Sequence, residues 1–317
     1  MHIGRGKTGT TALQRLFASA RAGLQQQGVR YVVAGNSPGG YGHNNFAKAF
    51  IDAPAPYMVM PRNLDEVVEA VRSELLAAGE PRIVMSAENF ASADPRRVAS
   101  FVEAAVPGAE VRIIFFARSQ DELVESQCNQ FVRTARIQVS FESFIASYDE
   151  ELEFDRVLEP WATVFGKGAI IARVYDGAAP IAEMVTWLPL RVPLELDPQV
   201  ASGVNASSGI IATELMRLLN GHEIDVRHRA YAALARALEP LDLPPVYFSA
   251  DEARTYRRRF AASNRNFSRT YLGRDLADLG GRRYSDEARD SVRAMAEMLP
   301  VGGAQRSPAS SSSLTIG

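Results

Sequence analysis

Residues 1–17, MHIGRGKTGTTALQRLF, join a loop rich in glycine and threonine to the start of an amphipathic helix. The loop, Gly4 to Thr11, holds three glycines, one lysine and three threonines. Glycine lets backbone N–H groups turn toward a ligand, while lysine and threonine supply a positive charge and hydroxyl donors. Apolar residues then recur at helical spacing as far as Leu24, and Gly28 stands where that helix is expected to end. Loop glycines before a helix N-terminus favour an anion site, because unpaired N–H groups face the ligand. The stretch therefore predicts a phosphate-binding loop.

The spacing in this loop is not that of a Walker A motif, which has four residues between its first glycine and Gly-Lys-[Ser/Thr]. Here a single residue separates Gly4 from Gly6-Lys7-Thr8. An ordinary turn before a helix is the competing interpretation, so the loop needs support from elsewhere in the chain. Only three residues precede Gly4, whereas a strand commonly has about five. We expect the true start to lie upstream, the alternative being a very short first strand.

Composition limits the classes of function that are open. The chain has 317 residues, 46% of them hydrophobic, and a net charge of −2, which disfavours nucleic acid as a partner. Cys128 is the only cysteine, which excludes an internal disulfide framework and a cysteine-rich zinc site. The sequence shows no apolar run long enough for a transmembrane segment and no signal peptide. We expect a cytoplasmic protein.

Predicted strands and helices alternate along the first half of the chain. Apolar, β-branched runs predict strands at 29–35, 82–90, 110–119 and 169–176. Helices are expected at 63–79, 94–108 and 119–133, with Asn63–Glu66 and Ser119–Glu122 as capping boxes. This order is typical of an α/β fold, a mostly parallel sheet flanked by helices. Beyond about residue 140 the pattern becomes largely helical. We expect one domain over 1–300 and a disordered Gly/Ser-rich tail over 301–317.

Two stretches together resemble the P-loop sulfotransferases that use 3′-phosphoadenosine-5′-phosphosulfate (PAPS), and more narrowly their bacterial branch. Residues 2–14, HIGRGKTGTTALQ, match the opening H-I-G-x-x-K-T-G-T-T-x-L-Q of that branch at every fixed position. The family's second element is a strand that ends in arginine, followed eight residues later by a helical serine. IIFFARSQDELVESQCNQ supplies Arg118 and Ser126 at that spacing. Weaker similarity touches most of residues 1–275.

The resemblance implies a P-loop-type α/β fold and transfer of a sulfuryl group from PAPS to an acceptor hydroxyl or amine. It implies that the first loop binds the 5′-phosphosulfate, and that Arg118 and Ser126 bind the 3′-phosphate. A guanidinium at the carboxyl end of a parallel strand suits that role. We expect Lys7 to stabilise charge on the transferring group. The loop residues expected to bind the nucleotide are Gly6, Lys7, Thr8, Gly9, Thr10 and Thr11. No metal is expected.

Two residues are candidates for the base that accepts the acceptor's proton. Glu88 follows a predicted strand in MSAENF, and related carbohydrate sulfotransferases often use a glutamate. His43 lies in the glycine-rich loop 35–45 and has the natural pKa for proton transfer near neutrality. We expect Glu88 to be the base, with His43 as the alternative. The competing interpretations are a cap or ion-pair carboxylate for Glu88 and a packed loop histidine for His43.

Other features leave the acceptor open. A small molecule, a glycan or a lipid all fit the resemblance, because acceptor pockets are built from variable segments. The arginine-rich run 254–269 is interpreted as a solvated helix face, the alternative being a rim for an anionic acceptor. Trp161 is expected in the core and Asn205 in the packing of the helical half. The rival functions are a non-catalytic nucleotide-binding relative and a small-molecule kinase that uses ATP and Mg²⁺.

Overall fold

The described part of the chain is a mixed α/β structure, rich in helices, with short parallel strands. The computed structural model describes residues 1–36, 40–54, 58–134, 137–146, 152–175, 185–192, 194, 209–220, 233, 237, 246–281 and 290. The predicted tail 301–317 and Asn205 lie outside these residues. The expected α/β class is confirmed at this level.

Four strands form two parallel pairs. β1 (Val29–Tyr31) pairs with β2 (Arg82–Val84), and Val29 stands opposite Arg82. β3 (Ile113–Ala117) pairs with β4 (Ile170–Val174), and Ile113 stands opposite Ile170. Each of the four predicted strand segments therefore contains a strand. All four run in the same direction within their pairs, as the alternation of strands and helices predicts.

The N-terminal residues connect the two pairs. His2 forms parallel bridges to both Ser86, just beyond β2, and Ile114 in β3. The His2 amide donates to the Met85 carbonyl at 2.8 Å, and the Ile3 amide donates to the Ile114 carbonyl at 3.0 Å. Residues 1–5 therefore lie between β2 and β3, and the loop that follows them emerges beside the carboxyl ends of both.

Helices cover both faces of this strand layer. The helices of the first part are α1 (Thr10–Ser19), α2 (Arg21–Gln26), α3 (Asn44–Lys48), α4 (Leu64–Leu76), the 3₁₀ helix η1 (Glu88–Ser92) and α5 (Pro95–Ala105). The helix predicted to run to Gly28 is divided at Ala20, and Gly28 ends its second part with φ +72°. Such a positive φ favours glycine, because a Cβ would clash with the backbone there.

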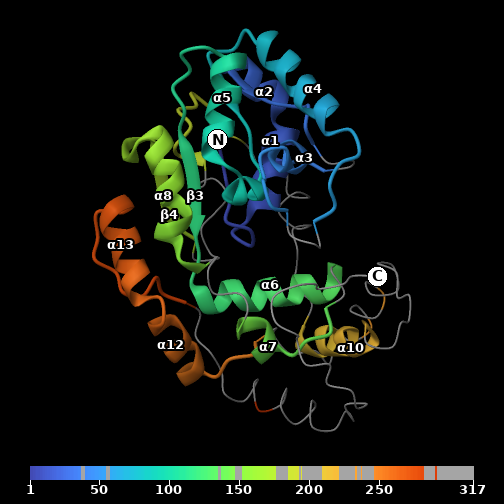
Figure 1. The fold of residues 1–317 in the computed structure, drawn as a ribbon, viewed down its shortest axis with the longest axis vertical. Helices are drawn as coiled ribbons and strands as arrows, with labels where there is room; N and C mark the ends of the chain where they lie inside the picture. Colours follow the sequence, from blue (N-terminus) through green and yellow to red (C-terminus); the bar gives the residue numbers. More distant parts are fainter. Residues whose placement is uncertain are drawn as a thin grey trace.

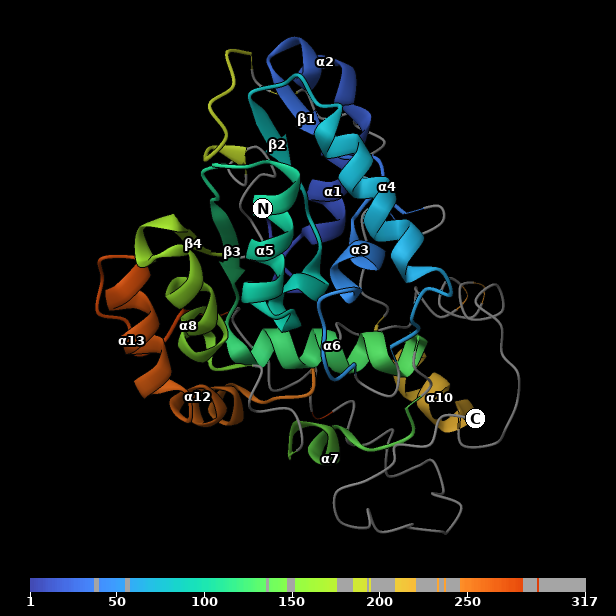
Figure 2. The same ribbon diagram turned by 45° about the horizontal axis from the view of Figure 1, so that its top comes forward.

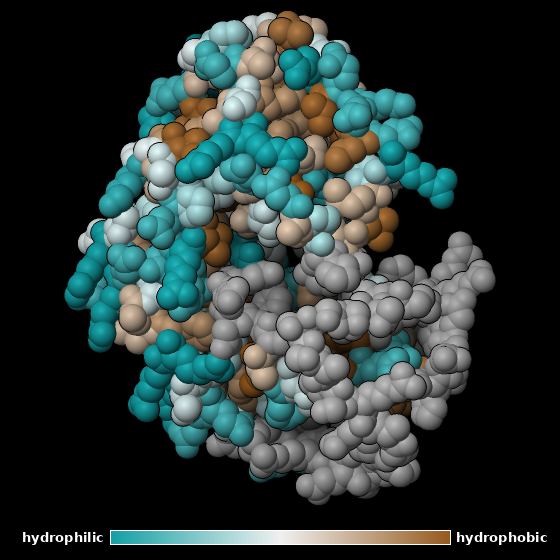
Figure 3. All heavy atoms as spheres, in the orientation of Figure 1, coloured by the Kyte–Doolittle hydropathy of each residue, from teal (hydrophilic) through white to brown (hydrophobic). Residues whose placement is uncertain are grey.

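The second part is largely helical, as predicted. It contains α6 (Gln120–Thr134), α7 (Phe141–Ala146), α8 (Phe154–Phe165), the 3₁₀ helix η3 (Lys167–Ala169), α10 (Ile210–Asn220), α12 (Ala250–Arg258) and α13 (Ala261–Tyr271). Figures 1 and 2 show α6 crossing below the strands, with α7, α10 and α12 on its other side. α8 and α13 pack together beside β3 and β4. Figure 3 shows a mainly hydrophilic described surface with hydrophobic residues in small, separate groups.

The packing of the core explains why the sequence of β3 is a continuous apolar run. All five of its residues are buried. Ile114 and Phe116 pack with α1 residues such as Phe17, whereas Phe115 packs against Phe154 and Phe267 from α8 and α13. Alternate side chains of a strand point to opposite faces, so a parallel strand covered on both sides must be apolar throughout. Trp161 is 1% exposed, which confirms it as a core residue.

The two predicted capping boxes are wrong in detail. Asn63 makes no capping hydrogen bond, and its amide instead donates to the Glu66 carboxylate at 2.9 Å. The Ser119 hydroxyl donates to Asp121, while Glu122 accepts from Arg118. At both helix starts the side chains bind other side chains and not the backbone N–H groups that a capping box would use. The sequence pattern identified the helix starts but not the competing partners.

Candidate functional site

A cavity of about 250 Å³ lies where the strands end. It is lined by Lys7, Gly9, Thr10, Thr11, Glu88, Arg118, Ser126, Gln130, Arg133 and Tyr175. These residues come from the first loop, the start of η1, the ends of β3 and β4, and one face of α6. The structure thus brings together seven of the residues predicted from sequence, although they stand as far as 119 positions apart along the chain.

The first loop is held in shape by its own threonines. The Thr8 hydroxyl donates to the Arg5 carbonyl at 2.5 Å, and the Thr10 hydroxyl donates to the same oxygen at 3.1 Å. Lys7 and Gly9 adopt φ of +64° and +76°, and Gly9 immediately precedes α1. Thr8 is fully buried, so its hydroxyl serves the loop rather than the cavity. Neither Thr8 nor Gly6 lines the cavity, unlike the other predicted loop residues.

Arg118 ties the end of β3 to the loop. Its Nη1 donates to the Lys7 carbonyl at 2.8 Å. Its Nε and Nη2 donate to Glu122 Oε2 at 3.1 and 2.8 Å, and its guanidinium lies 5.7 Å from the ring centre of Tyr175. The side chain is 18% exposed. These contacts hold the guanidinium at the cavity wall in one orientation.

Positive charge is concentrated at this cavity. Lys7, Arg118 and Arg133 all line it. The pKa of Lys7 is lowered to about 8, mainly by burial and also by the Arg133 and Arg118 guanidinium groups, while Glu88 acts in the opposite direction. Within the described residues, no carboxylate lies within ion-pair distance of Lys7 or Arg133. Three cations gathered at one cavity, two of them without an ion-pair partner among the described residues, favour an anionic ligand.

Glu88 lies directly below the loop at the first residue of η1. A Cβ on Gly6 would stand 3.6 Å from Glu88 Oε2, and one on Gly4 would stand 3.4 Å from the Glu88 Cα. The loop therefore passes close to this carboxylate. Burial raises the pKa of Glu88 above the ordinary carboxyl value, while the charges of Lys7 and Arg5 partly oppose that shift. A carboxyl with a raised pKa beside a cation is a common arrangement for proton transfer.

One face of α6 completes the cavity. Ser126, Gln130 and Arg133 are spaced by four and then three residues, which places them on the same side of a helix. Sequence reasoning identified Ser126 but missed Gln130, Arg133 and Tyr175. The spacing of Gln130 and Arg133 from Ser126 could have predicted that these two residues share its helix face. Tyr175 follows β4, and only the pairing of β4 with β3 brings it to Arg118.

His43 does not reach this cavity. It is 0% exposed and lies just before α3. Its Nδ1 accepts from the Ser86 amide at 3.0 Å, and its Nε2 donates to the Val32 carbonyl at 2.9 Å. Burial lowers the pKa of His43. Both ring nitrogens bind backbone groups, so His43 joins the ends of β1 and β2.

A buried polar network surrounds Ser86. The Ser86 hydroxyl lies 2.7 Å from His2 Nδ1, and Gln14 Nε2 donates to that hydroxyl at 3.3 Å. A Cβ on Gly42 would stand 2.4 Å from the Gln14 side chain. His2 and Gln14 both belong to the first sequence motif. Their contacts explain these two motif residues as structural supports for the strand ends beside the loop.

Four of the six arginines in the run 254–269 pair with carboxylates. Arg254 pairs with Asp251, Arg257 with Asp121 and Asp278, and Arg265 and Arg269 with Asp275. Arg257 is 12% exposed, so it ties α12 to the start of α6 rather than facing solvent. These ion pairs favour a structural role for the paired arginines. They disfavour the alternative, a rim that binds an anionic acceptor.

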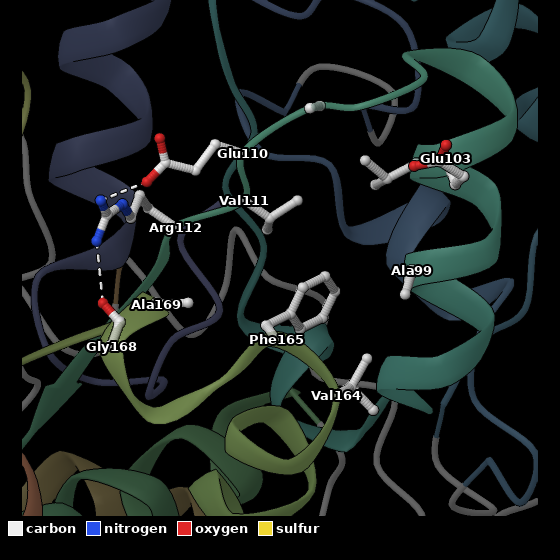
Figure 4. Close-up of a pocket in the computed structure, with 11 residues that line it drawn as sticks. Ala99, Glu103, Glu110, Val111, Arg112, Val164, Phe165, Gly168 and Ala169 are labelled. Atoms are coloured by element: carbon white, nitrogen blue, oxygen red, sulfur yellow. Dashed lines mark hydrogen bonds and ion pairs between the residues drawn. The ribbon is translucent and has the colours of Figure 1, made fainter.

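Two larger hollows contain none of the predicted residues. One of about 680 Å³ opens between α5, α8 and η3, and Figure 4 shows Phe165 and Val111 in its wall beside Arg112, which binds Glu110 and the Gly168 carbonyl. The other, of about 590 Å³, lies among α7, α10 and α12. Within the described residues, neither is lined by the glycine- and threonine-rich loop or by three cations, as the 250 Å³ cavity is.

The described residues include no group of three or more His, Cys, Asp or Glu side chains placed to hold a metal ion. None of the described helices is both long enough and apolar enough to cross a membrane.

Comparisons with known proteins add little to this site. No protein-family model matches the chain, and no curated protein sequence matches it. One solved structure with similarity is a sulfotransferase from Alicyclobacillus acidocaldarius, at 15% identity and a TM-score of 0.39. The match covers 73% of this chain and 96% of that one. Similarity at this level establishes neither a shared fold nor a shared activity, so the function must be argued from the site.

Proposed function

We propose that the chain is a sulfotransferase that moves a sulfuryl group from PAPS to an acceptor hydroxyl or amine. One observation carries the proposal: Lys7, the loop residues 9–11, Arg118 and Ser126 line a single cavity that also contains Glu88. The loop and the Arg118–Ser126 pair supply two separate places for phosphate. PAPS differs from ATP by its 3′-phosphate, so a second phosphate site is the feature that distinguishes the two nucleotides.

The binding roles follow from position. Lys7 and the amides that begin α1 bind the 5′-phosphosulfate, because a lysine and a helix N-terminus converge there. Arg118 and the Ser126 hydroxyl bind the 3′-phosphate. Glu122 and the Lys7 carbonyl orient the Arg118 guanidinium, whose other N–H groups remain for the ligand. The 250 Å³ cavity is smaller than the ~300–1,000 Å³ of typical ligand pockets. We therefore place only the phosphate-bearing part of the nucleotide in it.

The transfer needs one proton acceptor and a stabilised leaving group. The acceptor oxygen forms a bond to sulfur while the bond from sulfur to the 5′-phosphate oxygen breaks, and adenosine 3′,5′-bisphosphate leaves. Glu88 takes the proton of the acceptor hydroxyl or amine, and Lys7 stabilises the charge that builds up on the leaving phosphate. Glu88 is preferred to His43 as the base because it lines the cavity, whereas His43 is bound on both nitrogens.

The first test is a thermal-shift titration with adenosine 3′,5′-bisphosphate, run beside ATP and AMP. A ligand at 100 times its Kd stabilises a protein by about 2.7 kcal/mol. The expected result is stabilisation by the bisphosphate alone, with loss of the effect in Arg118→Ala and Lys7→Ala. Arg269→Gln, on α13 and paired with Asp275, is the control for removal of a positive charge elsewhere.

The other outcomes separate the rival functions. Equal stabilisation by ATP and the bisphosphate would oppose a 3′-phosphate site and favour a kinase. Bisphosphate binding with no release of bisphosphate from PAPS on any acceptor tried would favour a nucleotide-binding protein without catalysis. The absence of any response would remove the proposal.

A further inference from the structure

Arg133 is a cation of the cavity that the proposed function leaves without a partner. It lines the cavity, and within the described residues its side chain has no ion pair or hydrogen bond. Arg118 differs, because its guanidinium is fixed by Glu122 and the Lys7 carbonyl. An arginine at a cavity wall without a carboxylate partner presents five N–H donors and a full charge to whatever enters.

Arg118 lies just before the start of α6, whereas Arg133 lies near the end of this helix. It follows Ser126 by seven residues, which is about 10 Å along a helix axis. A phosphate held by Arg118 and Ser126 is therefore two helical turns from the base of Arg133. Arg133 therefore lies at the end of the cavity away from the proposed 3′-phosphate site.

That side is where the acceptor must enter. The acceptor oxygen has to approach sulfur in line with the breaking bond and beside Glu88, which is close to Lys7. The 5′-phosphosulfate is assigned to Lys7 and the amides that begin α1, and the 3′-phosphate to Arg118 and Ser126. Arg133 is therefore left for an anionic group of the acceptor. Gln130, one turn before Arg133 on the same face, adds an amide that donates and accepts hydrogen bonds.

We propose that Arg133, with Gln130 beside it, selects an acceptor that carries a carboxylate or sulfate group near the hydroxyl to be modified. An acidic saccharide has this chemistry, and a neutral sugar lacks it. The inference rests on the proposed function. Arg133, and not the arginine run 254–269, is then the residue that binds an anionic acceptor. Four arginines of that run are paired with carboxylates.

A matched pair of probes tests this selectivity. p-Nitrophenyl β-D-glucuronide and p-nitrophenyl β-D-glucoside differ only in the carboxylate at carbon 6. Each is titrated by calorimetry into the full chain saturated with adenosine 3′,5′-bisphosphate, so that binding is measured without turnover. A charge-assisted contact should make the glucuronide bind about tenfold more tightly. That preference should fall to about one in Arg133→Gln, be partly kept in Arg133→Lys, and be unchanged in the control Arg269→Gln.

The outcomes distinguish this inference from the proposed function. If the bisphosphate does not bind at all, the proposed function fails and this inference fails with it. If the bisphosphate binds but the glucuronide has no advantage, or an advantage that survives in Arg133→Gln, only this inference is overturned. A loss of bisphosphate affinity in Arg133→Gln as large as in Arg118→Ala would also overturn it, because Arg133 would then serve the nucleotide.

Discussion

The guanidinium of Arg118 donates a 2.8 Å hydrogen bond from Nη1 to the carbonyl oxygen of Lys7. This bond joins the end of β3 to the first loop across 111 positions of sequence. The bond couples the two proposed phosphate sites, because Lys7 belongs to one and Arg118 to the other. Glu122 also orients the Arg118 guanidinium. A disturbance at either end should therefore be felt at the other.

Removal of Arg118 should cost both stability and binding. Arg118→Ala removes the arginine that pairs with the Glu122 carboxylate, which is 10% exposed. Loss of such a charged hydrogen-bond partner by a mostly buried group costs about 1–3 kcal/mol. The double variant Arg118→Ala/Glu122→Ala should regain part of that stability, because no unpaired charge is left, but should not regain bisphosphate binding. Urea unfolding and calorimetry measure the two quantities. Recovery of binding in the double variant would show that Arg118 does not contact the 3′-phosphate.

The dependence of turnover on pH should have two limbs. Glu88 must be deprotonated to act as a base, and burial raises its pKa, so kcat/KM should rise with pH at values above those of an ordinary carboxyl. Lys7 must be protonated, and its pKa is about 8, so kcat/KM should fall above about pH 8. The two groups interact, so both apparent values belong to the pair.

Substitution of Glu88 provides the control for this profile. Glu88→Gln should lose the acidic limb together with most of kcat, while it keeps bisphosphate affinity. A Glu88→Gln variant with normal kcat would oppose Glu88 as the base.

Lys7 should destabilise the folded protein at neutral pH. Its folded pKa of about 8 lies below the ordinary 10.5, so between these values the unfolded chain binds more protons than the folded one. The free energy of unfolding should therefore rise with pH across this window, and the destabilisation is fully present below about pH 8. Lys7→Met should be more stable than the wild type at pH 7, with a difference that shrinks toward pH 10. Urea unfolding at three pH values measures it. A constant difference would mean that the Lys7 pKa is not lowered.

His43 should matter for stability rather than for chemistry. His43→Ala leaves the Ser86 amide and the Val32 carbonyl without their buried partner, at about 1–3 kcal/mol for each group. Burial lowers the His43 pKa, so the unfolded chain takes up a proton first as pH falls and wild-type stability should decline below the ordinary histidine value. Activity per folded molecule should be unchanged. A specific loss of kcat at full stability would restore His43 as the base.

Gly9 should be required for both its conformation and its place in the loop. Its φ of +76° makes a Cβ costly, by about 1–2 kcal/mol. Gly108 has a similar φ of +72°, is exposed, and has open space where a Cβ would stand. Gly108→Ala is therefore the matched control. Both variants should lose similar stability, but only Gly9→Ala should weaken bisphosphate binding. Equal bisphosphate affinity in the two variants would show that Gly9 is not needed for binding of the bisphosphate.

The sequence alone was sufficient for features that depend on local patterns. The apolar run of β3 predicted a buried strand because both faces of such a strand are covered, and the structure confirms it. The glycines and threonines of residues 4–11 predicted the first loop, and the resemblance of the Arg118–Ser126 segment to a known family implied that both residues would lie near it. Each of these signals lies within about one strand or helix, where period and residue type determine which side chains share a face.

Tertiary structure decided which polar residues meet. His43 and Glu88 were both plausible bases in sequence, but the pairing of β1 with β2 buries His43 between strand ends, while η1 carries Glu88 under the loop. Tyr175 joins the cavity only because β4 pairs with β3. Partners of long polar side chains depend on distances between segments far apart in sequence, and no local period encodes those distances. The sequence therefore determined the elements and the loop, and the packing of those elements determined the site.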